Sequence, residues 1–234
     1  LDEKFANTSV NFYAIFDGHG GPEAAEFLET RFLGILVDFL LAKTLEPFSH
    51  KHPDAKVAAL VETDPVASAL CHAFVKCDSK LLSTPIKSGS TAVVVLIIGD
   101  ILYAANCGDA EAVLGQITTL DKGLIKAECL TVKHNPCERD EKLRILDAGG
   151  TVYARAVDPT ERLNGKLAVS RSFGDANYKL PICKTHADLV IVELKAVDDP
   201  CGAMVSAAEL LRTQPDLIIA SGPEVALQAV MGAS

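Results

Sequence analysis

Hydrophobic positions follow two different periods along this chain, and each change of period indicates a new structural element. Residues 10–16 (VNFYAIF) are rich in β-branched and aromatic residues and predict a strand. After a glycine-rich turn, apolar residues recur at helical spacing from Pro22 until Pro47, which predicts a long helix. Its expected buried stripe consists of Ala25, Leu28, Phe32, Ile35 or Leu36, and Phe39.

A second helix is predicted after a polar loop at residues 47–56. Asp64 and Pro65 are residue types typical of an N-cap and a first helical position. The positions expected on its buried face are Val66, Ala69, Leu70, Ala73, Phe74, Cys77 and Leu81.

The following segments predict antiparallel strands. Two apolar runs at residues 91–107 are separated by Gly99 and Asp100, a pair that suits a type II′ hairpin. Because neighbouring strands form hairpins, a parallel doubly wound sheet is excluded and one α+β domain is expected. The remaining predicted elements are a strand at 110–117, a strand that ends at residues 129–134, a helix at 138–148, a strand and turn at 166–175, a strand at 188–194, a helix at 203–212 and a strand at 216–220.

Composition narrows the function classes. The net charge of -9 argues against a nucleic-acid partner, because such binding depends on clustered Lys and Arg. The longest apolar run, from Ala92, is too short to span a membrane and ends at Asp100. The seven cysteines are scattered without a C-x-x-C pair, so we expect reduced thiols of an intracellular protein, cytoplasmic or nuclear, and no zinc site.

The turn after the first strand contains candidate chemistry. Asp17 and His19 stand among Gly18, Gly20 and Gly21, although a turn by itself requires only the glycines. Asp17 and the Gly18 carbonyl are the two kinds of oxygen ligand that Mg²⁺ or Mn²⁺ prefers. His19 could deliver a proton to a leaving group. The alternative interpretation is a simple tight turn.

Two further segments at predicted turns contain charged residues. Asp109 follows a glycine between two predicted strands, with Glu111 two residues later, and a capped hairpin turn is the alternative there. Residues 170–175 contain Arg171 and Asp175 beside a predicted turn. We interpret these two as a structural pair, because a buried charge requires a partner.

Four stretches in this order resemble the metal-dependent protein serine/threonine phosphatases of the type 2C (PPM) family. They are residues 12–29, 88–114, 130–152 and 162–179, and together they cover most of residues 10–180. The resemblance implies a four-layer α-β-β-α sandwich, in which two antiparallel sheets are flanked by helices, with a metal site at one end. It also implies that residues 1–234 form a single domain of this type.

The resemblance assigns roles to individual residues. Asp17 would bridge two Mg²⁺ or Mn²⁺ ions, Gly18 would ligate one through its carbonyl, and Asp109 would bind a weaker third ion. His19 would be the general acid. The implied reaction is hydrolysis of phosphoserine or phosphothreonine in a phosphoprotein by metal-activated water, with no phosphoenzyme and no other cofactor. We expect a monomer.

The sequence also departs from the family pattern. An acidic, arginine-bearing segment before the first motif and two later aspartate motifs are not recognisable, and Ser221 precedes Gly222 where an aspartate belongs. Glu111 stands where an arginine is common. We therefore expect a domain that is incomplete at its N-terminal edge and in its C-terminal third. Two functions stay open: a metal-dependent phosphatase, or a catalytically impaired pseudophosphatase that serves as a binding or scaffold domain.

Overall fold

The structure is a computed structural model, and it describes seven parts of the chain. These are residues 8–42, 44–45, 55–118, 124–156, 158–179, 188–193 and 217–220.

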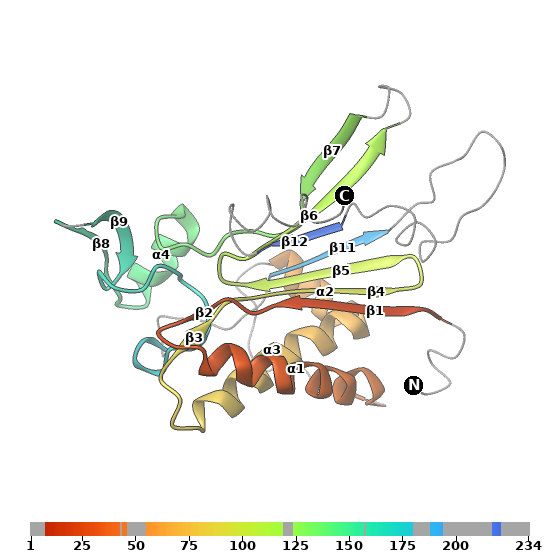
Figure 1. The fold of residues 1–234 in the computed structure, drawn as a ribbon, viewed down its shortest axis with the longest axis horizontal. Helices are drawn as coiled ribbons and strands as arrows, with labels where there is room; N and C mark the ends of the chain where they lie inside the picture. The colour runs from red at the N-terminus through yellow and green to blue at the C-terminus, as the bar shows by residue number, and fades with distance from the viewer. Residues whose placement is uncertain are drawn as a thin grey trace.

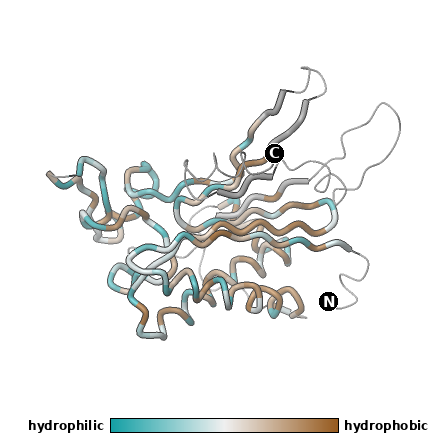
Figure 2. Tube along the Cα trace, viewed as in Figure 1, coloured by the Kyte–Doolittle hydropathy of each residue, from teal (hydrophilic) through white to brown (hydrophobic). Residues whose placement is uncertain are grey.

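The larger sheet has four antiparallel strands in the order β1-β4-β5-β11. The strand β4 is buried on both faces because helices cover one side and a second sheet covers the other. Val94 and Leu96 pack toward the helices, whereas Val95 and Ile97 pack toward the second sheet. Figure 2 shows the resulting concentration of hydrophobic residues in the central strands. The strands are β1 (Val10–Ile15), β4 (Ala92–Ile98), β5 (Ile101–Cys107) and β11 (Asp188–Glu193).

Three helices lie on one side of this sheet (Figure 1): α1 (Glu23–Leu41), α2 (Ala55–Thr63) and α3 (Pro65–Leu82). The prediction of α3 is confirmed; α1 is confirmed as a helix, but it ends at Leu41 and not at Pro47. The Asp64 carboxylate caps α3 by accepting hydrogen bonds from the amides of Val66 and Ala67. All seven residues expected on the inner face of α3 are buried. The sequence analysis did not predict α2.

The second sheet covers the opposite face of the larger one, in the order β12-β6-β7. Ala112 of β6 and Leu130 just after β7 pack against the β4 and β5 side chains. The predicted class, helices with antiparallel sheets, is therefore confirmed. The helix predicted at residues 203–212 lies outside the described residues. The strands are β6 (Glu111–Thr118), β7 (Leu124–Cys129) and β12 (Leu217–Ala220).

A small three-stranded sheet joins three distant segments at one end of the larger sheet. It consists of β2 (Gly18–His19), β3 (Gly89–Ser90) and β10 (Phe173–Gly174), with β3 in the centre. In the register, His19 and Gly174 both lie opposite Gly89. This sheet brings the glycine-rich turn beside residues that follow it in sequence by more than one hundred positions.

An aromatic cluster lies beneath the small sheet. Phe173 of β10 is fully buried, with its ring 5.3 Å from the ring of Phe74 and 6.4 Å from that of Phe32. The cluster joins α1 and α3 to β10 and therefore fixes the small sheet relative to the main core. Phe16 is partly buried and packs against Phe32, with the ring centroids 5.7 Å apart.

A helix and a hairpin form the end of the molecule nearest the small sheet: α4 (Arg139–Asp147), β8 (Val152–Arg155) and β9 (Asp158–Leu163). The prediction of α4 is confirmed. The β8–β9 hairpin lies where a loop was expected, and of the strand predicted at residues 166–175 only β10 is present. The described residues contain no helix that is long and apolar enough to cross a membrane.

Glu141 of α4 is the centre of a buried charge cluster that fixes residues 170–171. Its carboxylate accepts hydrogen bonds from Arg144 Nη2 (2.8 Å), Arg171 Nη2 (2.7 Å) and Ser170 Oγ (2.5 Å). Burial alone would raise the pKa of Glu141, but the hydrogen bonds and charges of Arg144 and Arg171 outweigh it and hold the pKa well below its usual value. The cluster therefore stabilises the fold only while Glu141 is ionised.

Replacing Glu141 should test this cluster. Glu141→Gln leaves two buried arginines without their anion, so we expect the free energy of unfolding at pH 7 to fall by about 3 kcal/mol. A depressed pKa stabilises the fold above the unfolded-state value of about 4.3 and loses that effect as the pH falls, so the variant should also show a weaker loss of stability below about pH 5.

Urea unfolding at several pH values measures both effects. Glu161→Gln is the matched control, because Glu161 pairs with Lys142 (2.6 Å) at the surface and its loss should cost less than about 1 kcal/mol. Equal costs for the two variants would contradict the role given to Glu141.

Candidate active site

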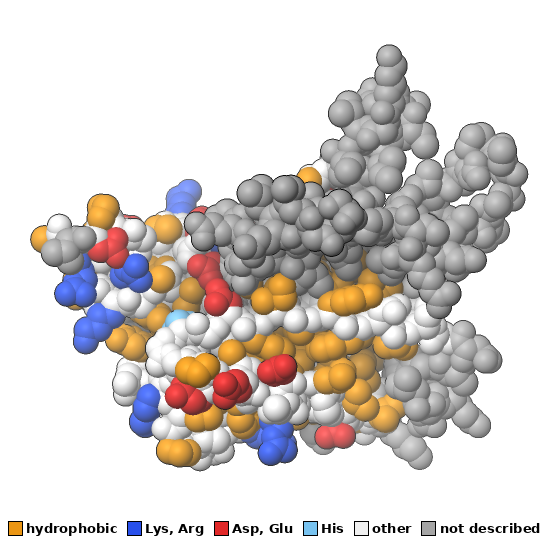
Figure 3. Space-filling model, in the orientation of Figure 1, with side chains coloured by type: hydrophobic (Ala, Val, Ile, Leu, Met, Phe, Trp, Pro, Cys, Tyr) orange, Lys and Arg blue, Asp and Glu red, His pale blue; other side chains and the backbone are white. Residues whose placement is uncertain are grey.

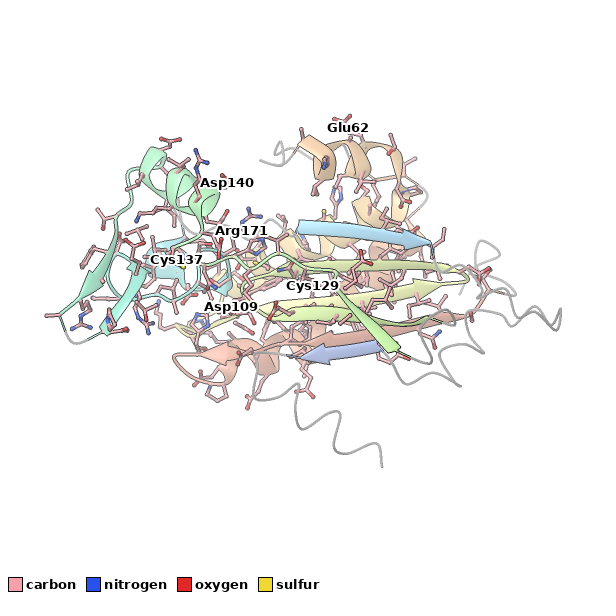
Figure 4. All side chains as sticks on the ribbon, turned by 90° about the horizontal axis from the view of Figure 1, so that it is seen from above. Glu62, Asp109, Cys129, Cys137, Asp140 and Arg171 are labelled. Carbon is pink, nitrogen blue, oxygen red and sulfur yellow. The ribbon has the colours of Figure 1, made fainter. Side chains whose placement is uncertain are left out.

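A cleft of about 420 Å³ opens at the end of the larger sheet, beside α4 and the β8–β9 hairpin. All four residues predicted as site residues line it. Figure 4 shows Asp109 at this end of the sheet, on the side nearest α4. The lining residues are Asp17, Gly18, His19, Gly20, Thr91, Asp109, Arg162, Lys166, Leu167, Ala168 and Val169.

The turn that carries Asp17 is held between β1 and the small sheet. The Asp17 carbonyl accepts a hydrogen bond from the Thr91 amide (2.9 Å), and Gly18 pairs with Ser90. Gly20 and Gly21 have φ angles of 71° and 137°, which other residues rarely adopt. The glycines therefore permit a turn that leaves the Asp17 side chain exposed at the cleft.

Asp109 is positioned by the segment that follows β7. The Gly108 amide donates to His134 Nδ1 and the His134 amide donates to the Gly108 carbonyl, both at 3.0 Å. The Asn135 amide, oriented to satisfy its neighbours, donates to Asp109 Oδ2 at 3.3 Å. Burial and the nearby charge of Asp17 raise the pKa of Asp109. A cation bound beside Asp109 would offset the cost of ionising this partly buried carboxylate.

His19 is paired with a carboxylate from a distant part of the sequence. Its Nε2 lies 2.7 Å from Asp175 Oδ2, and the Asp175 side chain is only 8% exposed. The pair expected between Arg171 and Asp175 is wrong, because Arg171 bonds to Glu141 and Asp175 bonds to His19. Sequence reasoning missed the partner of His19.

Two basic residues also line the cleft. Arg162 of β9 and Lys166, in the turn after it, face a cleft that also contains the two carboxylates. Arg162 Nε is held by Asp158 Oδ2 at 2.7 Å. Figure 3 shows Lys and Arg side chains gathered at this end of the molecule. The sequence analysis did not single out either residue; their position in the fourth family-like stretch, residues 162–179, was the available signal.

The donor set suits a hard cation. Asp17, Asp109 and the Gly18 carbonyl supply oxygen ligands, and the hydroxyl of Thr91, which lines the same cleft, is buried without a hydrogen-bond partner. Mg²⁺ commonly takes one or two carboxylates and completes its shell with water. The described residues contain no group of three or more His, Cys, Asp or Glu that could hold a metal. Ser221 and Gly222 lie outside them.

Neither Glu111 nor any described cysteine lines the cleft. Glu111, at the start of β6, pairs with Lys133 at 2.9 Å. Of the described cysteines, Cys71, Cys77 and Cys107 are buried, while Cys129 and Cys137 are exposed, and none of the five forms a disulfide. Burial raises the pKa of Cys77 to about 12, so this thiol is not a nucleophile at neutral pH.

Known proteins match both the sequence and the fold. The family model for protein phosphatase 2C matches residues 2–206. Over 174 residues the chain is 35% identical to protein phosphatase 2C homolog 3 of Schizosaccharomyces pombe, covering 73% of this chain and 34% of that protein. Over 178 residues it is 34% identical to the human integrin-linked kinase-associated serine/threonine phosphatase 2C, covering 74% of this chain and 40% of that protein.

The fold comparison agrees with the sequence comparison. The crystal structure of a serine-threonine phosphatase 2C from Toxoplasma gondii superimposes with a TM-score of 0.61 at 21% identity, covering 80% of this chain and 64% of that one. The chain spans less than half the length of the two relatives in fission yeast and human. The match to the family model extends over most of the sequence, from the first strand through β11. The chain belongs to the protein phosphatase 2C family.

Proposed function

We propose that this chain hydrolyses phosphoserine and phosphothreonine in proteins, with Mg²⁺ or Mn²⁺ bound in the cleft. One observation carries the proposal: Asp17, Asp109 and His19 line a single cleft together with the basic residues Arg162 and Lys166, in a chain of a phosphatase family. The carboxylates provide cation ligands, the histidine provides an acid, and Arg162 and Lys166 provide charge that attracts a phosphoryl group.

Asp17, the Gly18 carbonyl and Asp109 are the residues that would hold the metal. Bound there, Mg²⁺ or Mn²⁺ would lower the pKa of a coordinated water and neutralise phosphoryl oxygens. The Asp17 side chain is exposed, and the Asp109 carboxylate accepts a hydrogen bond from the Asn135 amide. We expect Asp17 to be shared between ions and Asp109 to bind the weaker one.

His19 would act on the leaving group. Its ring lies at the cleft, and Nδ1 has no hydrogen-bond partner among the described residues, so that atom is available to protonate an alkoxide. A phosphoprotein is the expected partner, and the monomeric state stays a prediction.

Asp17→Asn tests the metal site. The substitution keeps the size of the side chain but removes the charge that offsets a cation, so we expect Mn²⁺ affinity to fall by at least about tenfold and turnover to fall with it. Titration calorimetry measures binding independently of activity. Asp38→Asn, on the exposed face of α1, is the matched control and should change neither quantity. Unchanged Mn²⁺ affinity in the Asp17 variant would exclude this residue as a ligand.

His19→Gln tests the acid. We expect hydrolysis of a phosphoserine peptide to slow by about 10² to 10⁴-fold, while hydrolysis of an aryl phosphate slows much less, because a good leaving group needs little protonation. Mn²⁺ affinity should stay nearly intact. If both substrates slow equally, His19 is not the acid.

An assay of the unmodified chain distinguishes a phosphatase from a binding module. We expect release of phosphate from phosphoserine peptides at millimolar Mn²⁺. If the folded chain binds such a peptide but releases no phosphate, the pseudophosphatase alternative replaces the proposal.

A further inference from the structure

We propose that Asp175 is a positioning residue for His19, fixing both the orientation and the tautomer of its ring. This inference rests on the proposed function, since it gives His19 the role of acid. Asp175 Oδ2 lies 2.7 Å from His19 Nε2, so Nε2 carries a proton and donates it to the carboxylate. The other nitrogen, Nδ1, is then the atom left to face the reacting group.

The small sheet is built so that these two side chains can meet. His19 and Gly174 lie on either side of Gly89 in the register, and Asp175 follows Gly174 directly. A Cβ on Gly89 would overlap both the Asp175 carboxylate and His19 Nε2. The absence of a side chain at the central position therefore opens the space in which the hydrogen bond forms.

Asp175 is held in place by contacts of its own. Ser172 Oγ donates to the same carboxylate oxygen at 2.5 Å. The Gly174 amide donates to Asp78 on α3 at 2.8 Å, and Lys179 pairs with the other oxygen of Asp78 at 3.2 Å. Asp175 also has a left-handed backbone (φ 49°), a conformation that Asp and Asn tolerate better than most residues. The carboxylate is thus fixed by Ser172, and the backbone beside it is fixed by Asp78, so Asp175 can orient a neighbouring ring.

The proton balance of the step follows from this arrangement. When the bond between phosphorus and the serine oxygen breaks, its electron pair goes to that oxygen, which takes the proton from Nδ1 of doubly protonated His19. Nε2 keeps its proton and its hydrogen bond to Asp175, so the ring ends as the neutral tautomer protonated on Nε2. The phosphoryl group is transferred to water, which gives inorganic phosphate and free serine. Asp175 remains ionised and exchanges no proton.

Asp175→Asn tests this role in the full chain with Mn²⁺. Asparagine keeps the shape and tolerates the left-handed backbone, but its amide can donate to Nε2 and so favour the wrong tautomer. We expect kcat on a phosphoserine peptide to fall by at least about tenfold, with a much smaller loss on an aryl phosphate and an unchanged KM. Asp147→Asn, on the exposed side of α4, is the matched control and should not change either rate.

A double-mutant cycle separates positioning from stability. If Asp175 acts through His19, Asp175→Asn should cost less than about twofold in the His19→Gln background. Full additivity of the two losses would overturn the proposal, because it would give Asp175 an effect independent of His19.

Nitrogen-15 spectra of the metal-free protein test the proposal without activity. Neutral His19 should be protonated on Nε2 in the unmodified chain and should lose this preference in Asp175→Asn. An unchanged tautomer in the variant would overturn the proposal. If the unmodified chain shows the expected tautomer but releases no phosphate, the proposed function fails while the pairing of Asp175 with His19 stands.

Discussion

The absence of a side chain at position 89 is the constraint on which the site depends. Gly89 is the centre of the small sheet, and its two neighbours bring His19 and Asp175 together across 156 residues of sequence. The sheet is short, but Phe173 anchors it to the aromatic cluster of the core, and the hydrogen bond from the Gly174 amide anchors it to Asp78. A packed core thus positions two polar side chains that the local sequence alone could not bring together.

Two buried or partly buried carboxylates of this protein have opposite electrostatic environments. Asp109 is partly buried near Asp17, and its raised pKa indicates that its ionised form is disfavoured there. Glu141 shows the opposite case, because two arginines hold its pKa low and make its charge stabilising. The charge of Glu141 is therefore compensated within the protein, whereas we propose that a bound cation compensates the acidic groups at the cleft.

The sequence predicts the elements whose burial follows a local pattern. The continuous apolar run of β4, the helical stripe of α3 and the Asp64 cap all involve neighbours close in sequence, so local pattern predicted them. The helix α2 was missed because its nine residues bury only Val57 and Val61. The β8–β9 hairpin was missed because β8 is mostly exposed, β9 buries only Leu163, and neither strand alternates between buried and exposed residues.

The residues of the candidate site were likewise predicted where the local sequence carries the signal and missed where the fold brings distant residues together. Asp17, His19 and Asp109 stand beside glycines at strand ends. A turn there does not require a carboxylate or an imidazole, so these side chains could be singled out from the sequence. Asp175 was assigned to Arg171 because the two are close along the chain, whereas its partner is set by the register of the small sheet. Arg162 and Lys166 reach the cleft only through the folding of the hairpin and its turn.

Diffraction from crystals grown with Mn²⁺, measured near the manganese absorption edge, tests most directly whether this cleft is a metal-dependent catalytic site. An anomalous peak between the carboxylates of Asp17 and Asp109, within coordination distance of both or joined to Asp109 through water, is the predicted result. An ordered cleft with no peak there at millimolar Mn²⁺, or peaks only elsewhere on the surface, would contradict it.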